Sequence, residues 1–183
     1  MTRPADKPWL AGIILAGGQS RRMGADKVEL EFDGRRLIDI ARSLSSKAGC
    51  DAVFVSGRPQ AENAIPDSQS GSGPAQAMLD CLDFLGSAFE GALFLPVDMP
   101  LLQAADLTEL LAGQSGHCRA WENHPLPVYM PAGLSLPPRD KVHSIRSLLA
   151  ALPVQWRDLP EDRLARFANL NTAEELTAAL KLR

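Results

Sequence analysis

The sequence is poor in the features that would place the protein outside the ordinary globular class. Only 3 of its 183 residues are cysteine, and none forms a CxxC pair, so neither a disulfide framework nor a zinc site is expected. No apolar run approaches the roughly 18 residues of a membrane-spanning helix. Acidic residues (22) nearly balance basic ones (19), which gives no reason to expect nucleic acid or a membrane as a partner. We expect a cytoplasmic protein with buried or half-buried thiols.

An apolar run at residues 9–18 follows two basic residues and so faintly resembles a signal peptide. The run is short, contains three glycines and passes directly into a charged loop. We therefore interpret it as the first strand of the core. The length of the chain is typical of one domain, and we expect residues 1–183 to form a single domain with a sizeable core.

Strand-like and helix-like segments alternate along the chain. Uninterrupted apolar character predicts buried strands, and apolar residues at helical spacing predict amphipathic helices. Thr172 and Glu175 form a Thr-x-x-Glu capping box, which predicts a C-terminal helix after Thr172. The predicted strands are 12–16, 51–56, 91–97, 117–121, 126–130 and 154–156; the predicted helices are 35–48, 74–86, 104–111 and 144–152; residues 60–74 are predicted to form an extended surface loop.

This alternation predicts an α/β fold: a single-domain three-layer sandwich with a Rossmann-like, mostly parallel sheet and helices on both faces. In such sheets, ligands bind outside the carboxyl ends of the strands. Three polar features follow predicted strands: the loop after Ala16, the segment after Ser56, and Asp98. We therefore expect these features to line one crevice.

The loop from Leu15 to Lys27, LAGGQSRRMGADK, combines flexible backbone with positive charge. Gly17 and Gly18 lack side chains, so backbone N–H groups can approach an anion closely. The loop also holds three cations within seven residues, which could neutralise the charge of a phosphate group. They are Arg21, Arg22 and Lys27. The loop fits neither the Walker A nor the GxGxxG pattern. Its composition and spacing predict an anion-binding loop between a strand and a helix.

The same loop resembles the signature LAGGxSxRMGxDK of the molybdenum cofactor guanylyltransferases, the MobA family, at every defined position. The resemblance extends along most of the chain. Residues 96–100 (PVDMP) are similar to the family's PCDTP element, His124-Pro125 to its HP step, and residues 169–176 (NLNTAEEL) to its NVNTPEEL element. It implies a nucleotide-diphospho-sugar transferase-like fold and transfer of GMP from GTP to the terminal phosphate of molybdopterin, with release of pyrophosphate. Other molybdenum cofactor proteins are implied as further partners.

The resemblance also implies roles for individual residues. The backbone of the first loop would hold guanine and ribose; the residues concerned are Leu15, Ala16, Gly17 and Gly18. The cations Arg21, Arg22 and Lys27 would bind the β- and γ-phosphates and the leaving pyrophosphate. Asp98 would hold Mg²⁺, because a hard cation prefers carboxylate oxygen and water. Alternatively, Asp98 is a turn or capping aspartate.

Four further positions are candidates for the nucleotide or metal site. Asp67 either helps to hold the nucleotide or is a turn residue. Ser56 stands where relatives carry asparagine, and its role would be through the backbone. Asn169 and Asn171 either bind Mg²⁺ or phosphate, or form Asx turns before the last helix.

The sequence departs from the family pattern on the acceptor side. The family's GPLAG element is GPAQA at residues 73–77, PCDTP has become PVDMP, and residues 131–147 differ from the usual segment. DMP also occurs in related cytidylyltransferases, whereas those relatives carry LAAG in place of LAGG. Three functions therefore stay open: transfer of GMP to molybdopterin, transfer of CMP or another nucleotide to a phosphate acceptor, and non-catalytic nucleotide binding.

Overall fold

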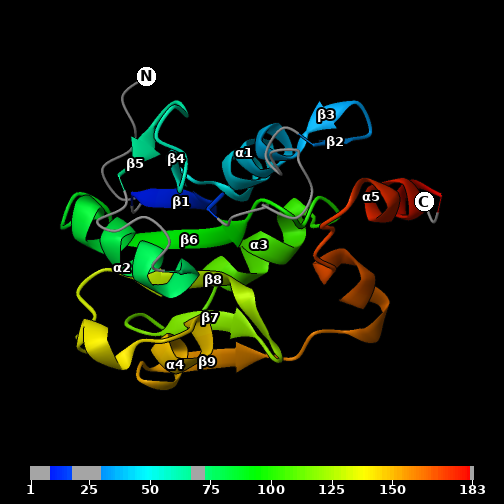
Figure 1. The fold of residues 1–183 in the computed structure, drawn as a ribbon. Helices are drawn as coiled ribbons and strands as arrows, with labels where there is room; N and C mark the ends of the chain where they lie inside the picture. The colour runs from blue at the N-terminus through cyan, green and yellow to red at the C-terminus, as the bar shows by residue number, and fades with distance from the viewer. Residues whose placement is uncertain (1–8, 18–29, 67–72, 182–183) are drawn as a thin grey trace.

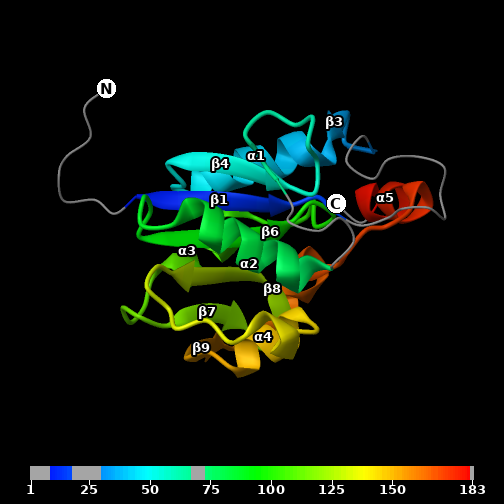
Figure 2. The ribbon, with the colours of Figure 1, turned by 60° about the vertical axis from the view of Figure 1, so that its left-hand side comes forward.

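The computed structural model of the chain describes residues 9–17, 30–66 and 73–181. Within these ranges a seven-stranded sheet lies between two layers of helices (Figures 1 and 2). Its strands are β1 (Leu10–Leu15), β4 (Ala52–Ser56), β5 (Ala64–Ile65), β6 (Gly91–Pro96), β7 (Cys118–Trp121), β8 (His124–Pro131) and β9 (Val154–Arg157). The helices are α1 (Leu37–Ala48), α2 (Pro74–Leu85), α3 (Ala104–Leu111), α4 (Ile145–Ala150) and α5 (Ala173–Leu180), with 3₁₀ segments η2 (Arg139–Lys141) and η3 (Glu161–Phe167).

The strand order is β5-β4-β1-β6-β8-β7-β9, and only β8 runs antiparallel to its neighbours within this sheet. The strands β5, β4, β1 and β6 form a parallel half, while β7 and β9 are parallel to each other across from β8. Because β7 is antiparallel to β8, and β8 to β6, the carboxyl ends of β7 and β9 lie at the same edge as those of β1, β4 and β6.

Two hydrophobic clusters fill the two faces of the sheet. Ile14 of β1 packs with residues of α1 and α3 on one face, whereas Ile13 and Leu15 pack with residues of α2 and α4 on the other. Figure 2 shows α2 and α4 in front of the sheet and α1 and α3 behind it. Burial on both faces explains why the sequence of β1 is apolar without alternation, as predicted.

Most predicted elements are confirmed within one to three residues, including the α2 helix that starts at Pro74 and the Thr172–Glu175 capping box of α5. The predicted loop at 60–74 is wrong in part, because Ala64 and Ile65 pair with β4 as β5. The short hairpin of β2 (Glu31–Phe32) and β3 (Arg35–Arg36) was not predicted. Each of the three strands β2, β3 and β5 is two residues long, which is too short for a periodic signal.

The three cysteines are free thiols, as the sequence predicts. Cys81 and Cys118 are buried and Cys50 is half-buried. Burial raises the pKa of Cys50 and of Cys118 to about 12, so both thiols stay protonated and unreactive at neutral pH. Among the described residues, no helix is long and apolar enough to cross a membrane.

Candidate functional site

The carboxyl ends of β1, β4 and β6 meet at one level of the sheet. Leu15 pairs with Ser56 on one side and with Pro96 on the other. Hydrogen bonds extend this pairing past the strand ends: the Ala16 N–H donates to the Ser56 carbonyl (3.0 Å), and the Val97 N–H donates to the Leu15 carbonyl (3.2 Å). The predicted convergence of the three strand ends is therefore confirmed for the described residues.

The backbone of the first loop packs directly against the residue that follows β4. Gly57 has φ +83°, and a Cβ added there would lie 2.3 Å from the Gly17 Cα and 2.4 Å from its N. No side chain fits in that space, so Gly57 has to be glycine for two reasons, its backbone conformation and its neighbour. Sequence reasoning missed Gly57, although a glycine directly after a buried strand is a usable signal.

The residues that lead into the first loop present their backbone and bury their side chains. Leu15 and Ala16 are 8% and 3% exposed, and Ser56 is 1% exposed. Gly17 is exposed. These side chains therefore belong to the core, and a ligand at this edge could contact only the backbone of Leu15, Ala16 and Ser56.

Asp98 lies two residues beyond β6 at the same edge, and its side chain is partly buried. Its backbone carbonyl accepts a hydrogen bond of 2.8 Å from the Leu170 N–H. This bond brings the 169–171 segment beside Asp98 although 72 residues separate them. Asn169 and Asn171 are exposed, and the Asn171 side chain donates to the Asn169 carbonyl (3.3 Å).

The donor set around Asp98 fits a magnesium ion bound together with phosphates. In the described part of the chain, no cluster of three or more His, Cys, Asp or Glu side chains could hold a metal unaided. Mg²⁺ does not need one, because it commonly takes one or two carboxylates and completes its shell with water and substrate phosphates. Asp98 would supply one carboxylate, and Asn169 and Asn171 in the adjoining segment carry amide oxygens that such an ion could accept as ligands.

Several predicted site residues lie outside the described residues. They are Gly18, Arg21, Arg22, Lys27 and Asp67. Their roles rest on the sequence alone and stay predictions. What the structure adds is the position from which the loop departs: residue 17, at the meeting point of β1, β4 and β6.

A second group of polar residues lies at the same edge of the sheet, beside the β7–β8 turn. The Arg146 side chain, from α4, donates to the Asn123 carbonyl (3.2 Å). The His124 ring, at the start of β8, packs 5.4 Å from the Phe167 ring. Burial, and then the positive charge of Arg146, lower the pKa of His124, so this imidazole is neutral at neutral pH.

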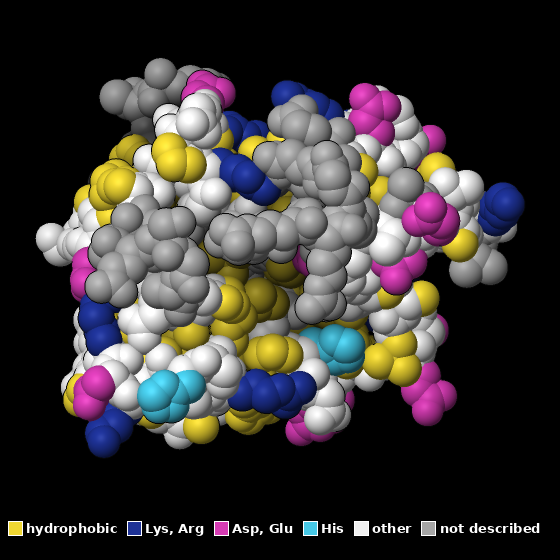
Figure 3. Space-filling view, viewed as in Figure 1, with side chains coloured by type: hydrophobic (Ala, Val, Ile, Leu, Met, Phe, Trp, Pro, Cys, Tyr) yellow, Lys and Arg dark blue, Asp and Glu magenta, His cyan; other side chains and the backbone are white. Residues whose placement is uncertain are grey.

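The space-filling view shows a hollow in this face of the molecule, with hydrophobic side chains on its floor and histidine and Lys or Arg side chains along its lower rim (Figure 3). Sequence reasoning assigned no role to Arg146, because it belongs to no motif. Only its contact with the β7–β8 turn brings it to this edge.

Comparisons with solved structures identify the fold. A nucleotidyl transferase from Methanothermobacter superposes with a TM-score of 0.74 at 15% identity, covering 96% of this chain and 99% of that one. A molybdopterin-guanine dinucleotide biosynthesis protein A from Archaeoglobus fulgidus gives 0.68 at 21% identity, covering 94% and 97%. These identities are low, so the two structures establish the fold alone: the predicted single α/β domain with a mostly parallel sheet.

Comparisons of sequence are more specific. A molybdenum cofactor guanylyltransferase from Xanthomonas euvesicatoria is 33% identical, covering 92% of this chain and 93% of the relative. A probable molybdenum cofactor guanylyltransferase from Mycobacterium avium is 33% identical over 98% of this chain and 99% of its own length. Residues 12–156 match the family described as the MobA-like NTP transferase domain. The chain therefore belongs to the family of MobA-like NTP transferases.

Proposed function

We propose that this protein transfers GMP from GTP to the terminal phosphate of molybdopterin and releases pyrophosphate. The observation that carries this proposal is the LAGGQSRRMGADK loop, which leaves the sheet where the ends of β1, β4 and β6 meet. Relatives of nearly equal length that bear the guanylyltransferase name support the same substrates. The expected setting is the cytoplasm, where the free thiols stay reduced.

The donor nucleotide would bind along the parallel half of the sheet. The backbone at Leu15, Ala16, Gly17 and Gly18 would surround the guanine and ribose. Arg21, Arg22 and Lys27 would neutralise the β- and γ-phosphates, and Ser56 and Asp67 would border the nucleotide. This arrangement would favour the departure of pyrophosphate, because cations beside it would stabilise the negative charge that develops as the bond breaks.

Asp98 would hold Mg²⁺ against the phosphates, with Asn169 or Asn171 as further oxygen ligands. The ion, when bound, stabilises negative charge on the phosphate oxygens. Leu170 would contribute indirectly, since its N–H donates to the Asp98 carbonyl and holds the backbone at this position.

The acceptor would lie toward β7, β8 and α4, where Arg146 would supply positive charge beside the β7–β8 turn and His124 is neutral. The acceptor phosphate is already ionised near neutral pH and needs no general base. One of its oxygens would form a bond to the α-phosphorus of GTP, while the bond from that phosphorus to the bridging oxygen breaks. Catalysis of this kind consists mainly of positioning and charge stabilisation.

The test is to incubate the protein with Mg²⁺, molybdopterin and each of the four nucleoside triphosphates, and to measure pyrophosphate release. We expect release with GTP and formation of a guanine dinucleotide. Release with CTP but not GTP would overturn the choice of nucleotide and favour transfer of CMP. The related cytidylyltransferases share the DMP of the PVDMP element. Tight nucleotide binding without turnover would favour a non-catalytic binding protein.

A further inference from the structure

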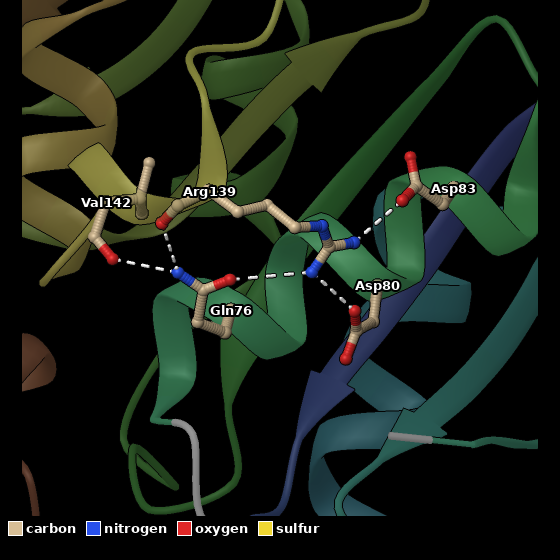
Figure 4. A network of polar contacts seen from close by, with 5 residues as sticks. All are labelled: Gln76, Asp80, Asp83, Arg139 and Val142. Atoms are coloured by element: carbon tan, nitrogen blue, oxygen red, sulfur yellow. Dashed lines mark hydrogen bonds and ion pairs between the residues drawn. The ribbon is translucent and has the colours of Figure 1, made fainter. Parts of the chain in front are cut away.

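Helix α2 and the segment that precedes α4 are joined by a reciprocal set of hydrogen bonds, which we call the 139–142 clasp (Figure 4). In one direction, the Gln76 side-chain N–H₂ group donates to the carbonyls of Arg139 (2.9 Å) and Val142 (2.8 Å). In the other direction, the Arg139 guanidinium donates to the carboxylates of Asp80 and Asp83, at 2.7 Å each. A side chain of α2 thus binds the backbone of the segment, and a side chain of the segment binds α2.

The clasp is firmly built. The Asp80 carboxylate is 5% exposed and paired with Arg139, and a buried carboxylate needs such a partner. The Val142 side chain is 3% exposed and packs in the cluster under α2. Gln76 uses both of its amide hydrogens on the carbonyls of the first residue of η2 and of the residue that follows η2, while its side-chain oxygen accepts a longer bond of 3.4 Å from Arg139.

The clasp lies a few residues before the acceptor side of the site. His143 and Ser144 follow Val142 directly, and both backbone N–H groups donate to the Ser147 hydroxyl at the start of α4. This tight turn leads to Arg146, whose side chain contacts the β7–β8 turn at Asn123. A shift of the segment at Val142 would therefore be carried into the position of Arg146.

The other end of the clasp is fixed to the donor half. Ala75, Met78 and Leu79 of α2 pack with Ile13 and Leu15 of β1, the strand that ends in the nucleotide loop. The family pattern has alanine where this chain has Gln76, and alanine has no side-chain amide to make the two bonds. In this chain, Gln76 makes the half of the clasp that binds the backbone of the 139–142 segment.

From this geometry we propose that Gln76 is a positioning residue that fixes the acceptor-binding segment, through η2 and α4, relative to the nucleotide-binding half. The inference rests on the proposed function for the identity of the acceptor. Gln76 acts through the segment and contacts no reacting atom. Its loss therefore raises the KM for molybdopterin and leaves the KM for GTP and kcat nearly unchanged.

The test uses Gln76→Glu, which keeps the shape and can still accept from Arg139 but cannot donate to the two carbonyls. We expect the KM for molybdopterin to rise on the order of 10-fold, with kcat and the KM for GTP within about 2-fold. Gln76→Ala, the residue of the family pattern, should show a smaller rise, because it brings no carboxylate against the carbonyls. Gln114→Glu is the matched control, since it makes the same charge change at an exposed position in the α3–β7 loop.

Hydrogen exchange supplies a readout that does not depend on turnover. In Gln76→Glu, amides of residues 140–149 should exchange faster, while those of 11–15 and 52–56 should not change. Equal exchange, or an unchanged KM for molybdopterin in an active variant, would overturn the inference and leave the proposed function standing. If the wild-type protein does not turn over GTP, the proposed function fails. The affinity for molybdopterin, measured by pterin fluorescence in wild type and variant, then tests the role of Gln76. Equal affinity in the two proteins, or no binding by either, would overturn the inference.

Discussion

The two halves of the carboxyl edge are built by different means. On the donor half, the described residues where β1 and β4 end present backbone: Gly17 and Gly57 touch without side chains, and the side chains of Leu15, Ala16 and Ser56 are buried. On the acceptor half, the contacts between elements are made by side chains that reach residues far away in the sequence. Gln76 to Val142 spans 66 residues, and Arg146 to Asn123 spans 23.

This difference explains how each half tolerates sequence change. A backbone site requires glycine or small residues at fixed spacing, because any Cβ fills the space that the ligand or the neighbouring strand needs. A site held by side chains can be rebuilt by substituting one pair for another. The donor loop keeps every defined position of the family pattern, whereas GPLAG is GPAQA here, and Gln76 of that segment makes two bonds of the 139–142 clasp. Four predictions test this contrast, in order of decreasing expected effect.

The largest effect is expected at Asp98, on which the donor chemistry depends. Asp98→Ala should reduce pyrophosphate release by about 10²–10³-fold or more, because the carboxylate that would hold Mg²⁺ is lost. The measurement is the initial rate at saturating GTP and molybdopterin over a range of Mg²⁺ concentrations. Asp158→Ala, at an exposed aspartate just after β9 at the same edge, is the control. Near-normal turnover in Asp98→Ala would remove the metal role.

The second prediction concerns the contact between Gly57 and Gly17. Gly57→Ala should destabilise the fold by about 3 kcal/mol and weaken GTP binding at least about 10-fold, because the added Cβ forces the two backbones apart. Urea denaturation and calorimetric titration with GTP measure the two effects.

Gly116→Ala separates conformational strain from this contact. Gly116 has φ +76°, close to the +83° of Gly57, but a Cβ added there meets nothing within 4 Å. That variant should lose about 1 kcal/mol and retain GTP affinity. If both variants behaved alike, the contact between Gly57 and Gly17 would have no role of its own.

The third prediction concerns Arg146 on the acceptor half. Arg146→Ala should raise the KM for molybdopterin about 10-fold without changing GTP binding, because a charge-assisted contact with the acceptor phosphate is lost. Steady-state kinetics with each substrate varied in turn measures this. Arg36→Ala, which removes an exposed ion pair with Asp39, should leave both KM values unchanged. A rise in the KM for GTP alone would assign Arg146 to the donor half.

The smallest effect is a change in the titration of His124. Burial and Arg146 lower its pKa below the usual 6.5, so Arg146→Gln should raise the pKa only in part, because burial remains. NMR titration of the imidazole measures the shift, and Arg36→Gln should not move it. Since the folded state takes up the proton less readily, the stability due to neutral His124 is present above pH 6.5 and is lost as the pH falls through the lower pKa of the folded state. A pKa unchanged in Arg146→Gln would show that Arg146 does not act on the ring.

Much of the fold could be predicted because its signals are local. Apolar runs gave β1, β4 and β6, Pro74 marked the start of α2, and the Thr172–Glu175 pair marked α5. The strand ends could be predicted to converge, since parallel strands have their carboxyl ends at one edge. The antiparallel direction of β8 and the two-residue β5 could not, because pairing partners far away in the sequence determine them.

The sequence by itself determined the family and predicted the nucleotide loop, because such a loop leaves its requirements in consecutive residues: paired glycines, cations and a strand before them. The tertiary structure alone decided the remainder of the site. Gly57 proved to be a contact of Gly17, Leu170 fixed the backbone of Asp98, and Gln76 bound the segment that carries Arg146. In each case the two partners are separated by tens of residues, and no local pattern records a contact that exists only once the sheet has formed.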